Sequence, residues 1–366
     1  MQALRSVRQL STFYFKDLKI ERATTTKPMP AEFPFGSYFT DHMFEVDHNN
    51  MTGWGIPKIT PFHNFDMHPA NTSLHYGIEC FEGMKAFRNE TEVLLFRPEK
   101  NLNRLLESFK FLTMPEFDPV ELQKILETLV DMDKNWIPNK PDHSLYLRPT
   151  GISMENRLGV HPPTDSKLFI ILSPTGPYFS KGFSPLRLFV EEEGARSWPG
   201  GPGSKKLGAN YGPTMFYQQR AVQKKFDQIL WLSERKYISE AGTMNFFIYW
   251  TNKKGVKEVV TPKLDGTLLP GITRLSIIEM LKADNVKVTE KLIKINEFVD
   301  ACKENRVHDC FTTGTACVTH QVKSFNYQGV EYTIPEGKLA GDLKNKLQDI
   351  QYGRVKSPWT KVIAKY

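Results

Sequence analysis

The sequence predicts an α/β fold of the mixed α+β kind, divided into two domains. The chain has 366 residues, of which 40% are hydrophobic and 24% charged, as expected of a globular protein with two sizeable cores. Apolar strands alternate with amphipathic helical segments in both halves. Between the halves lies PTGPYFSKGFSP (174–185), whose three prolines and two glycines are typical of a linker. We therefore expect a smaller domain over 17–180 and a larger one over 181–366, preceded by residues 1–16.

The first half contains two well-marked helices. NLNRLLESFKFL (101–112) places its apolar residues on one face at helical spacing. The second helix starts at DPVE, with Asp118 as N-cap, Pro119 in the first turn and Glu121 placed to close a capping box. Apolar runs predict the strands of this half at 92–96, 144–149 and 168–173.

The second half again alternates apolar runs with helical periodicity, and no internal repeat is visible in the sequence. The runs predict strands at 186–190, 229–233, 246–250 and 257–260. Periodicity predicts helices near 213–227, 274–283 and 297–305.

Composition argues against several classes of protein. The net charge is +7, but acids and bases are interleaved and no zinc-finger or RNP motif accompanies the charge, so we expect no nucleic acid as a partner. No apolar run approaches the roughly 18 residues of a membrane span, so we expect no membrane segment. The four cysteines form no C-x-x-C pair; we expect no metal site and a reducing compartment.

The first sixteen residues, MQALRSVRQLSTFYFK, contain three basic residues and no acid. Hydroxyl residues and apolar residues at helical spacing complete the profile of a mitochondrial transit peptide. We expect import into the mitochondrial matrix. The alternative is a cytoplasmic protein with a basic, frayed N-terminus.

Four segments of the second half combine glycine with small hydroxyl residues: GSKKLGANYGP (203–213), SEAGTMN (239–245), LPGITR (269–274) and TTGTAC (312–317). LPGITR opens a helix, and a helix N-terminus favours phosphate. A lysine between glycines, a carboxylate at Glu240 and phosphate cradles together suit pyridoxal phosphate, which needs an amine, a partner for its ring nitrogen and anion donors. Ordinary turns, or a basic protein that binds other anions, remain alternatives.

Eight motifs in order resemble the branched-chain amino acid aminotransferases of eukaryotic type. They are FTDHM, LHYGIECFEGMKAF, LFRPEKNLNRLL, SLYLRP, KLGANYGP, SEAGTMNFFIYW, LPGITR and TGTAC, and the resemblance runs from about residue 33 to IQYG at 350–353. It implies a fold-type IV pyridoxal 5'-phosphate enzyme, with the cofactor at the interface of two mixed α and β domains. It also implies a homodimer. D-amino acid aminotransferase and aminodeoxychorismate lyase are alternatives on the same fold.

The resemblance assigns roles to individual residues. Lys206, immediately before LGANYGP, is the implied Schiff-base lysine and catalytic base, whereas Lys205 occupies a variable position; in extended backbone only one of the two can face the cofactor. The implied cofactor-binding residues are Arg104, Lys206, Tyr211, Glu240, Ile272, Thr273 and Thr315. The implied substrate-binding residues are Phe35, Tyr76, Tyr146, Arg148, Val160, Tyr178, Thr243 and Ala316.

The implied reaction moves the amino group of leucine, isoleucine or valine to 2-oxoglutarate, giving a branched 2-oxo acid and glutamate. Arg148 would meet the distal carboxylate of glutamate; alternatively it is a structural arginine paired within its own domain. Tyr76 and the loop with Leu158 and Val160 would reach the site of the partner subunit. Mammalian members often carry C-x-x-C after GTA, but here the second position is His320, so we expect no dithiol switch at that place.

Overall fold

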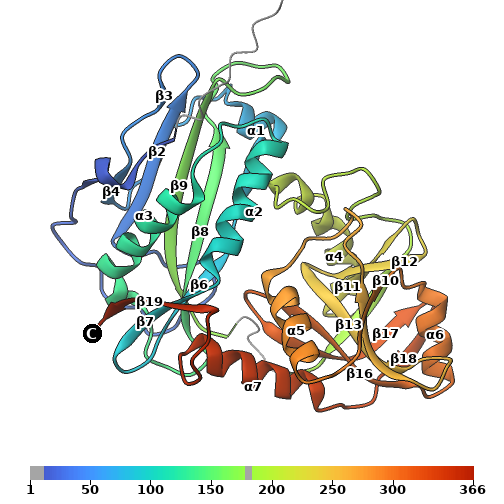
Figure 1. Ribbon diagram of the computed structural model, residues 1–366. Coiled ribbons are helices and arrows are strands. Elements are labelled where there is room, and N and C mark those ends of the chain that lie inside the picture. The colour runs from blue at the N-terminus through green and yellow to red at the C-terminus, as the bar shows by residue number, and fades with distance from the viewer. Residues whose placement is uncertain (1–11, 178–183) are drawn as a thin grey trace, which may run out of the picture. The chain divides into compact units, whose positions relative to one another are not determined.

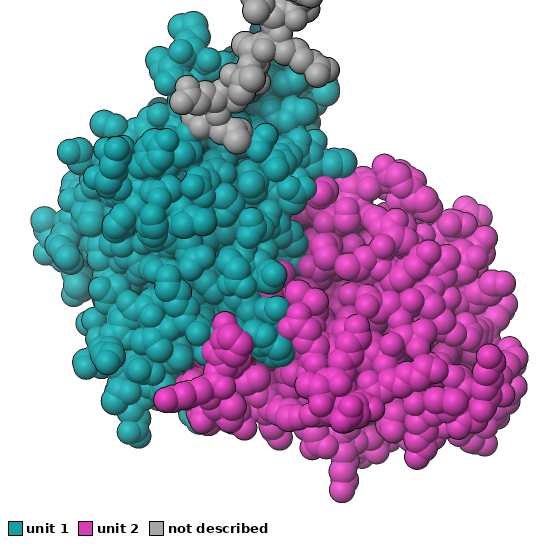
Figure 2. All heavy atoms as spheres, viewed as in Figure 1, with its two compact units in different colours: residues 1–176, 359–366 teal, residues 177–358 magenta. Residues whose placement is uncertain are grey.

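A computed structural model describes residues 12–177 and 184–366. The chain divides into two compact units, which Figure 2 shows in different colours. Unit 1 contains the residues up to 176 together with 359–366, and unit 2 contains residues 177–358. The end of the chain therefore belongs to unit 1 and not to the domain expected over 181–366.

Unit 1 is built on a ten-stranded sheet in which the order of the main path is β1-β4-β2-β9-β8-β6-β7-β19. All pairings are antiparallel except that of β1 with β4. The two longest strands lie at the centre, where they pair over ten residues. The strands are β1 (Lys19–Ile20), β2 (His42–Asn49), β3 (Gly53–Trp54), β4 (Lys58–Pro61), β5 (Glu79–Phe81), β6 (Met84–Arg88), β7 (Glu92–Phe96), β8 (Ser144–Ser153), β9 (Asp165–Thr175) and β19 (Thr360–Lys365).

Helices α2 (Pro98–Phe111) and α3 (Pro119–Met132) lie side by side on this sheet, as Figure 1 shows. Their apolar stripes are the ones that the sequence predicts, and Leu105, Phe109 and Leu126 are fully buried. Three short helical segments complete the unit: η1 (Phe15–Asp17), α1 (Thr72–Tyr76) and η2 (Lys134–Trp136).

The capping box predicted for α3 is only half formed. Asp118 accepts a hydrogen bond from the N–H of Val120, as an N-cap does. Glu121, however, accepts from the N–H of Phe15 at 2.7 Å, and the N–H of Asp118 donates to Thr12. Residues 12–15 therefore provide the partners that Asp118 and Glu121 would find in each other in a capping box. The four-residue motif alone could not indicate these partners, because they lie about 106 residues away in the sequence.

Phe13 ties this N-terminal segment to the core of unit 1. Its side chain is 2% exposed, and its ring lies 5.3 Å from that of Trp54 and 6.3 Å from that of Phe117. Residues 12–16 thus belong to the folded unit, although the expected transit peptide extends to residue 16. Residues 1–11 lie outside the described residues.

Unit 2 contains a nine-stranded sheet whose pairings close a ring. The path β12-β11-β10-β17-β16-β13 returns to its start because β12 also pairs with β13. The other three strands extend this ring at its sides. The strands are β10 (Leu186–Glu191), β11 (Gln228–Ser233), β12 (Tyr237–Ala241), β13 (Met244–Thr251), β14 (Lys257–Pro262), β15 (Val288–Lys291), β16 (Val307–Gly314), β17 (Val318–Tyr327) and β18 (Val330–Thr333).

The core of unit 2 gathers alternate apolar residues of these strands, among them Leu188, Met244 and Phe246. A smaller cluster beneath α4 contains Ile229 and Trp231. The alternation of side chains along each strand separates the two clusters. Unit 2 has the helices η3 (Gly208–Asn210), α4 (Thr214–Gln223), α5 (Ile272–Ala283), α6 (Ile295–Lys303) and α7 (Leu339–Gln351).

The last strand returns to unit 1. In Figure 1, β19 lies beside β7, with which it pairs in antiparallel register from Thr360 against Phe96 to Lys365 against Glu92. Arg88 stacks on the ring of Tyr366 at 3.9 Å. Among the described residues, none of the helices has the length and apolar character needed to cross a membrane.

Candidate active site

Lys206 lies in a loop of unit 2 that Asn210 holds in place. The buried amide of Asn210 donates hydrogen bonds to the carbonyls of Pro202 (3.0 Å) and Lys205 (2.8 Å). Lys206 Nζ donates to the hydroxyl of Tyr211 at 2.9 Å. The structure therefore brings together the two residues expected at the reactive end of the cofactor, and it ties the backbone before the lysine to the side chain of Asn210.

Glu240 belongs to a row of polar side chains on the outside of the strand ring. Its cross-strand partner is Asn245, and the partner of Asn245 on the next strand is Thr313; such opposed residues project on the same side of a sheet. Met244 is in the core, so Asn245 projects outward. Glu240 Oε1 accepts from Asn245 Nδ2 and from the N–H of Leu269, both at 3.1 Å. These bonds fix a carboxylate that is 2% exposed.

Helix α5 begins three residues after Leu269, whose N–H donates to this carboxylate. Its N-cap is Gly271, which has no side-chain cap, and Ile272 and Thr273 occupy its first two positions. The first N–H groups of a helix have no intrahelical acceptor, and with the helix dipole they favour an anion such as phosphate. Asn245 Nδ2 also donates to the carbonyl of Leu269 at 2.9 Å. The helix start is therefore held close to Glu240.

Thr315 and Ala316 lie in the turn that joins β16 to β17, directly after Gly314. Thr313 is 1% exposed, and among the described residues its hydroxyl has no hydrogen-bond partner. A buried hydroxyl without a partner indicates a missing polar group. Thr243 is exposed in the turn between β12 and β13. Unit 2 thus carries the expected kinds of group: the lysine in a loop, the carboxylate on β12, the start of α5, and hydroxyls in the turns after β12 and β16.

In unit 1, Arg104 is bound to Glu82 and is not solvated. Its Nε lies 2.6 Å from Glu82 Oε1 and its Nη2 lies 2.9 Å from Oε2. Glu82 is fully buried and also accepts from Asn101 Nδ2 at 2.9 Å. A two-pronged contact of this kind fixes the plane of the guanidinium. Helix α2 therefore presents Arg104 in a defined orientation, which the apolar stripe of the helix could not indicate.

Phe35, Tyr146 and Arg148 also come together in unit 1. The rings of Phe35 and Tyr146 meet edge to face at 4.8 Å, and Arg148 Nη2 donates to the Tyr146 hydroxyl at 3.1 Å. Gly83 makes room for that hydroxyl, because a Cβ at Gly83 would lie 1.9 Å from the Tyr146 oxygen. Gly83 follows Glu82, so the same turn positions both Arg104 and the tyrosine.

The guanidinium of Arg148 lies against two aromatic rings and near the carboxyl of Glu79. It stacks on the rings of Phe81 at 4.5 Å and Tyr146 at 5.2 Å. Its Nε is buried and has no hydrogen-bond partner among the described residues. Burial raises the pKa of the nearby Glu79 carboxyl, and the positive charge of Arg148 opposes that rise. A buried donor without an acceptor leaves the hydrogen bonding of the Arg148 guanidinium incomplete.

Tyr76 contacts the loop of Val160. The N–H of Gly159 donates to the Tyr76 hydroxyl at 3.0 Å. The apolar side chains around this contact are exposed: 61% for Leu74, 63% for Leu158 and 82% for Val160. This set forms an apolar surface on unit 1. Tyr178, the remaining expected substrate residue, lies outside the described residues.

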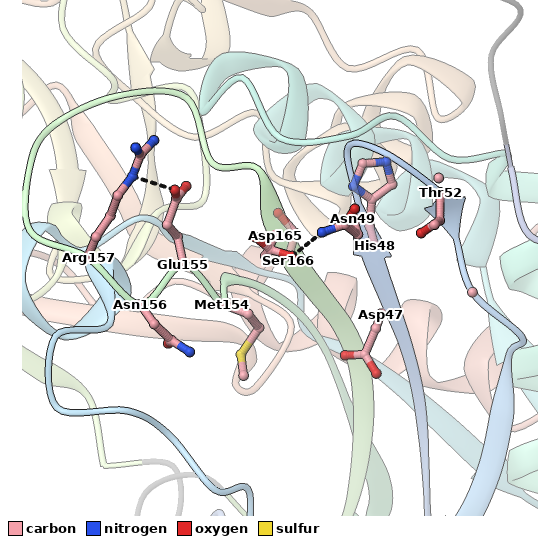
Figure 3. Close-up of a pocket in the computed structure, with 12 residues that line it drawn as sticks. Asp47, His48, Asn49, Thr52, Met154, Glu155, Asn156, Arg157, Asp165 and Ser166 are labelled. Atoms are coloured by element: carbon pink, nitrogen blue, oxygen red, sulfur yellow. Dashed lines mark hydrogen bonds and ion pairs between the residues drawn. The ribbon is translucent and has the colours of Figure 1, made fainter.

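A polar pocket of about 570 Å³ lies elsewhere in unit 1 and contains none of the expected site residues. Figure 3 shows its side chains, several of which pair with one another. Glu155 binds Arg157 at 2.7 Å, and Asn49 donates to Asp165 at 2.6 Å. Because these charges have partners within the pocket, we assign it no role in the chemistry. Among the described residues, no cluster of three or more histidine, cysteine and acidic side chains suits a metal ion.

The cysteines lie in apolar surroundings. Burial raises the pKa of Cys302 to about 12, and it also raises the pKa values of Cys80 and Cys310 well above the ordinary value of a thiol, so these thiols stay protonated and unreactive at neutral pH. Cys317 Sγ packs 3.4 Å from the sulfur of Met244. At the second position of the family motif, burial lowers the pKa of His320 and favours its neutral form.

Three further residues of the site were not predicted from the sequence: Glu82, Asn245 and Arg196. Each lies within or close to a quoted motif, but each acts on another side chain and not on a ligand. Arg196 Nε lies 2.8 Å from Glu240 Oε2. Such contacts depend on partners far apart in sequence. The one sequence signal for these three residues is that several polar residues lie close together in or near motifs that are expected to be buried.

The family model for amino-transferase class IV matches residues 79–325. The cytosolic branched-chain-amino-acid aminotransferase of Ovis aries is 44% identical, over 97% of this chain and 95% of its own length. The chain belongs to the branched-chain-amino-acid aminotransferases of class IV. The mitochondrial relative of Schizosaccharomyces pombe is also 44% identical, over 94% of this chain and 84% of that protein. The resemblance found in the sequence is confirmed.

Solved structures confirm the fold of the enzyme. The branched-chain aminotransferase of Thermoproteus uzoniensis, solved with norvaline, aligns with a TM-score of 0.73 at 20% identity, over 88% of this chain and 100% of that one. The branched-chain amino acid aminotransferase of Escherichia coli aligns with a TM-score of 0.73 at 21% identity, over 88% of this chain and 99% of that one. A third such enzyme, solved with pyridoxamine 5'-phosphate, aligns with a TM-score of 0.70 at 22% identity, over 89% of this chain and 100% of that one. The aminotransferase therefore has the mixed α and β fold-type IV architecture that the sequence predicts.

Proposed function

We propose that this aminotransferase moves the amino group of leucine, isoleucine or valine to 2-oxoglutarate, with pyridoxal 5'-phosphate bound to Lys206. The observation that carries the proposal is the set of groups on unit 2. A lysine amine touches a tyrosine hydroxyl, a buried carboxylate is fixed, and an uncapped helix start lies next to that carboxylate. These are the three kinds of group that the cofactor needs. The relatives named above favour this activity over the D-amino acid aminotransferase and lyase alternatives.

The residues present fit the cofactor. Glu240 would hold the ring nitrogen, Tyr211 the ring oxygen, and the N–H groups of Ile272 and Thr273 the phosphate, with Thr315 adding a hydroxyl. Arg104, from unit 1, is the proposed side-chain donor to the phosphate. When bound, pyridoxal 5'-phosphate supplies a ring that withdraws electrons from the substrate α-carbon and accepts its amino group.

Lys206 is the proposed proton carrier. Its amine would take the proton from the α-carbon of the amino acid and deliver it two atoms away, to the carbon that was the aldehyde of the cofactor, acting first as general base and then as general acid. Tyr211 orients that amine through the 2.9 Å contact. The backbone before Lys206 is held by the amide of Asn210, so the loop that carries the amine has a defined conformation.

The proposed substrate pocket has to accept both an apolar branched side chain and a carboxylate. Phe35 and Tyr146 supply an apolar wall, and Arg148 with the Tyr146 hydroxyl supplies the polar end. Thr243 and Ala316 are proposed at the opposite, carboxylate end of the substrate. Tyr76 and Val160 are proposed to reach the site of a partner subunit.

The activity is tested with a panel of amino donors and 2-oxoglutarate, following glutamate. L-Leucine, L-isoleucine and L-valine should each yield glutamate, and D-alanine should not. Aminodeoxychorismate, tested alone, should not be converted. Glutamate formation from D-alanine alone, or from no donor, would contradict the proposal.

Replacing Arg148 by alanine should harm the two half-reactions unequally. Glutamate and 2-oxoglutarate would lose a charge-assisted hydrogen bond, which contributes about 1.5–3 kcal/mol, or a roughly ten- to hundredfold change in rate. Leucine has no second carboxylate, so its half-reaction should be largely retained. Cofactor absorbance measures each half-reaction separately. Parallel losses with L-leucine and L-glutamate, together with a lower melting temperature, would instead identify Arg148 as a structural residue.

A homodimer is part of the proposal. The exposed apolar surface formed by Leu74, Tyr76, Leu158 and Val160 is of the kind that subunits cover in an assembly. The mass of one chain is 42.1 kDa. Sedimentation should therefore give about twice that mass, and a Val160→Lys variant should shift the particle toward the monomer. A monomeric wild-type enzyme with full activity would contradict the dimer.

We place the protein in the mitochondrial matrix, with the cytoplasm as the alternative; the relatives named above include both a cytosolic and a mitochondrial enzyme. Because Phe13 is buried in unit 1, we propose that any segment removed after import ends before Phe13. A fusion of residues 1–30 to a fluorescent reporter should enter mitochondria. The N-terminus of the imported full-length protein should then lie at or before Phe13.

A further inference from the structure

Arg196 is a deeply buried arginine next to Glu240, one of the proposed cofactor residues. It lies in the segment between β10 and the loop of Lys206, and its side chain is 2% exposed. A guanidinium stays charged at any physiological pH. Placing it in the interior is costly unless its N–H groups find acceptors and its charge finds a partner. The contacts of Arg196 therefore indicate which groups its charge stabilises.

The guanidinium contacts three segments of unit 2. Its Nε lies 2.8 Å from Glu240 Oε2. Its Nη1 donates to the carbonyl of Thr267 at 3.2 Å and, in a longer contact of 3.5 Å, to the carbonyl of Gly203. Thr267 precedes the turn that starts α5, and Gly203 opens the loop that carries Lys206. One side chain thus joins the carboxylate, the helix start and the lysine loop.

The packing around Gly203 shows how close these segments are. A Cβ at Gly203 would lie 2.6 Å from the Thr267 oxygen and 2.7 Å from the Cβ of Ser197, so no larger residue fits without moving the backbone. The hydroxyl of Ser197, which follows Arg196, also donates to the Thr267 carbonyl. The lysine loop and the segment before α5 are therefore in direct contact, with Arg196 beside them.

The two carboxylate oxygens of Glu240 have different partners. Oε1 accepts from the neutral donors Asn245 and Leu269 N–H, and Oε2 faces the charge of Arg196. An adjacent cation favours the ionised carboxylate. The hydrogen bonds to Oε1 and the ion pair at Oε2 together restrict the direction in which the carboxylate can meet a ligand.

We propose that Arg196 is a positioning residue for Glu240. It keeps this carboxylate ionised and oriented toward the ring nitrogen, and it couples that orientation to the lysine loop and to the start of α5. This inference rests on the proposed role of Glu240 in binding the cofactor. Arg196 touches no reacting atom itself, so its effect passes through Glu240.

The test is a double-mutant cycle on cofactor affinity. Equilibrium dialysis of the holoenzyme against graded pyridoxal 5'-phosphate gives dissociation constants for wild type, Arg196→Gln, Glu240→Gln and the double variant. Losing a charge-assisted contact should weaken binding about ten- to hundredfold in Arg196→Gln. In the Glu240→Gln background the same substitution should have a several-fold smaller effect, since the carboxylate on which it acts is gone.

Two further variants separate this role from general stability. Arg196→Lys keeps the charge and should recover part of the affinity, and it serves as the test if Arg196→Gln does not fold. Arg306→Gln is the matched control, because Arg306 pairs with Glu304 and the carbonyl of Thr251 away from the proposed site. The visible circular dichroism per mole of bound cofactor, which reports a fixed ring, should fall in Arg196→Gln and not in Arg306→Gln.

Equal effects of Arg196→Gln in both backgrounds would overturn the inference, as would unchanged affinity and dichroism in that variant. Failure of the proposed function has a different outcome: wild type would bind no cofactor or would form no glutamate with any donor. A wild-type enzyme that binds the cofactor and transaminates, but shows no coupling between positions 196 and 240, would leave the function intact and exclude the role of Arg196.

Discussion

Replacing Lys206 by alanine should abolish detectable transamination, while Lys205→Ala should keep turnover close to wild type. A positioned acid–base group contributes about 10²–10⁴-fold to a rate, and Lys206 is also the residue proposed to bond to the cofactor. The structure supports the choice between the neighbours, because Lys206 Nζ lies 2.9 Å from the Tyr211 hydroxyl. The Lys205→Ala control is matched, since both lysines lie in the same loop and carry the same charge.

The assignment is measured directly by borohydride reduction of the holoenzyme and peptide mapping. The label should lie on Lys206. A label on Lys205, or a Lys206→Ala enzyme with normal turnover, would assign the chemistry to another residue.

Glu240→Gln should slow both half-reactions by about a hundredfold, or about 3 kcal/mol, because an amide stabilises a protonated ring nitrogen far less than a carboxylate does. The melting temperature should also fall, because the substitution leaves the buried Arg196 without its carboxylate. Glu290→Gln is the control for that second effect: it removes the partner of Arg274, whose side chain is 3% exposed. It should lower stability and retain most of the activity.

The absorbance of the cofactor in a single turnover, with L-leucine and then with L-glutamate, measures the loss of rate in each half-reaction. Substrate exchange does not contribute to this measurement. Rates near wild type in a Glu240→Gln enzyme that retains its cofactor would show that the carboxylate serves the fold alone. A loss confined to one donor would point instead to a role in substrate recognition.

The parts of the fold that the sequence predicts are those with a strong local pattern. The helix expected at 101–112 is α2 (Pro98–Phe111), and the strand expected at 144–149 is the first part of β8 (Ser144–Ser153). Helix α7 was not predicted, because few of its residues are apolar and only part of one face is buried. Strand β19 was not predicted either, because it is a partly exposed strand whose pairing partner, β7, lies some 270 residues earlier along the chain.

The site residues also divide into those that a local pattern predicts and those that depend on distant partners. Residue types and glycine-rich turns indicated a lysine, a carboxylate and a phosphate cradle, but the choice of Lys206 and the role of Arg104 came from the family resemblance. The pattern around Arg104 allowed a solvated side chain, and only tertiary structure brings it to Glu82. Arg196 could not be predicted for the same reason, since its acceptors come from three segments that are distant in sequence.

The return of residues 359–366 to unit 1 has a consequence for the order in which the protein folds during synthesis. Unit 2, a continuous segment, can complete its strand ring as soon as residues 177–358 have left the ribosome. Unit 1 is made first but stays incomplete, because β7 is an unpaired sheet edge until β19 follows. Open edges of this kind invite pairing with other chains. The N-terminal half therefore spends the whole synthesis of unit 2 in an aggregation-prone form, and the synthesis of residues 359–366 ends that exposure.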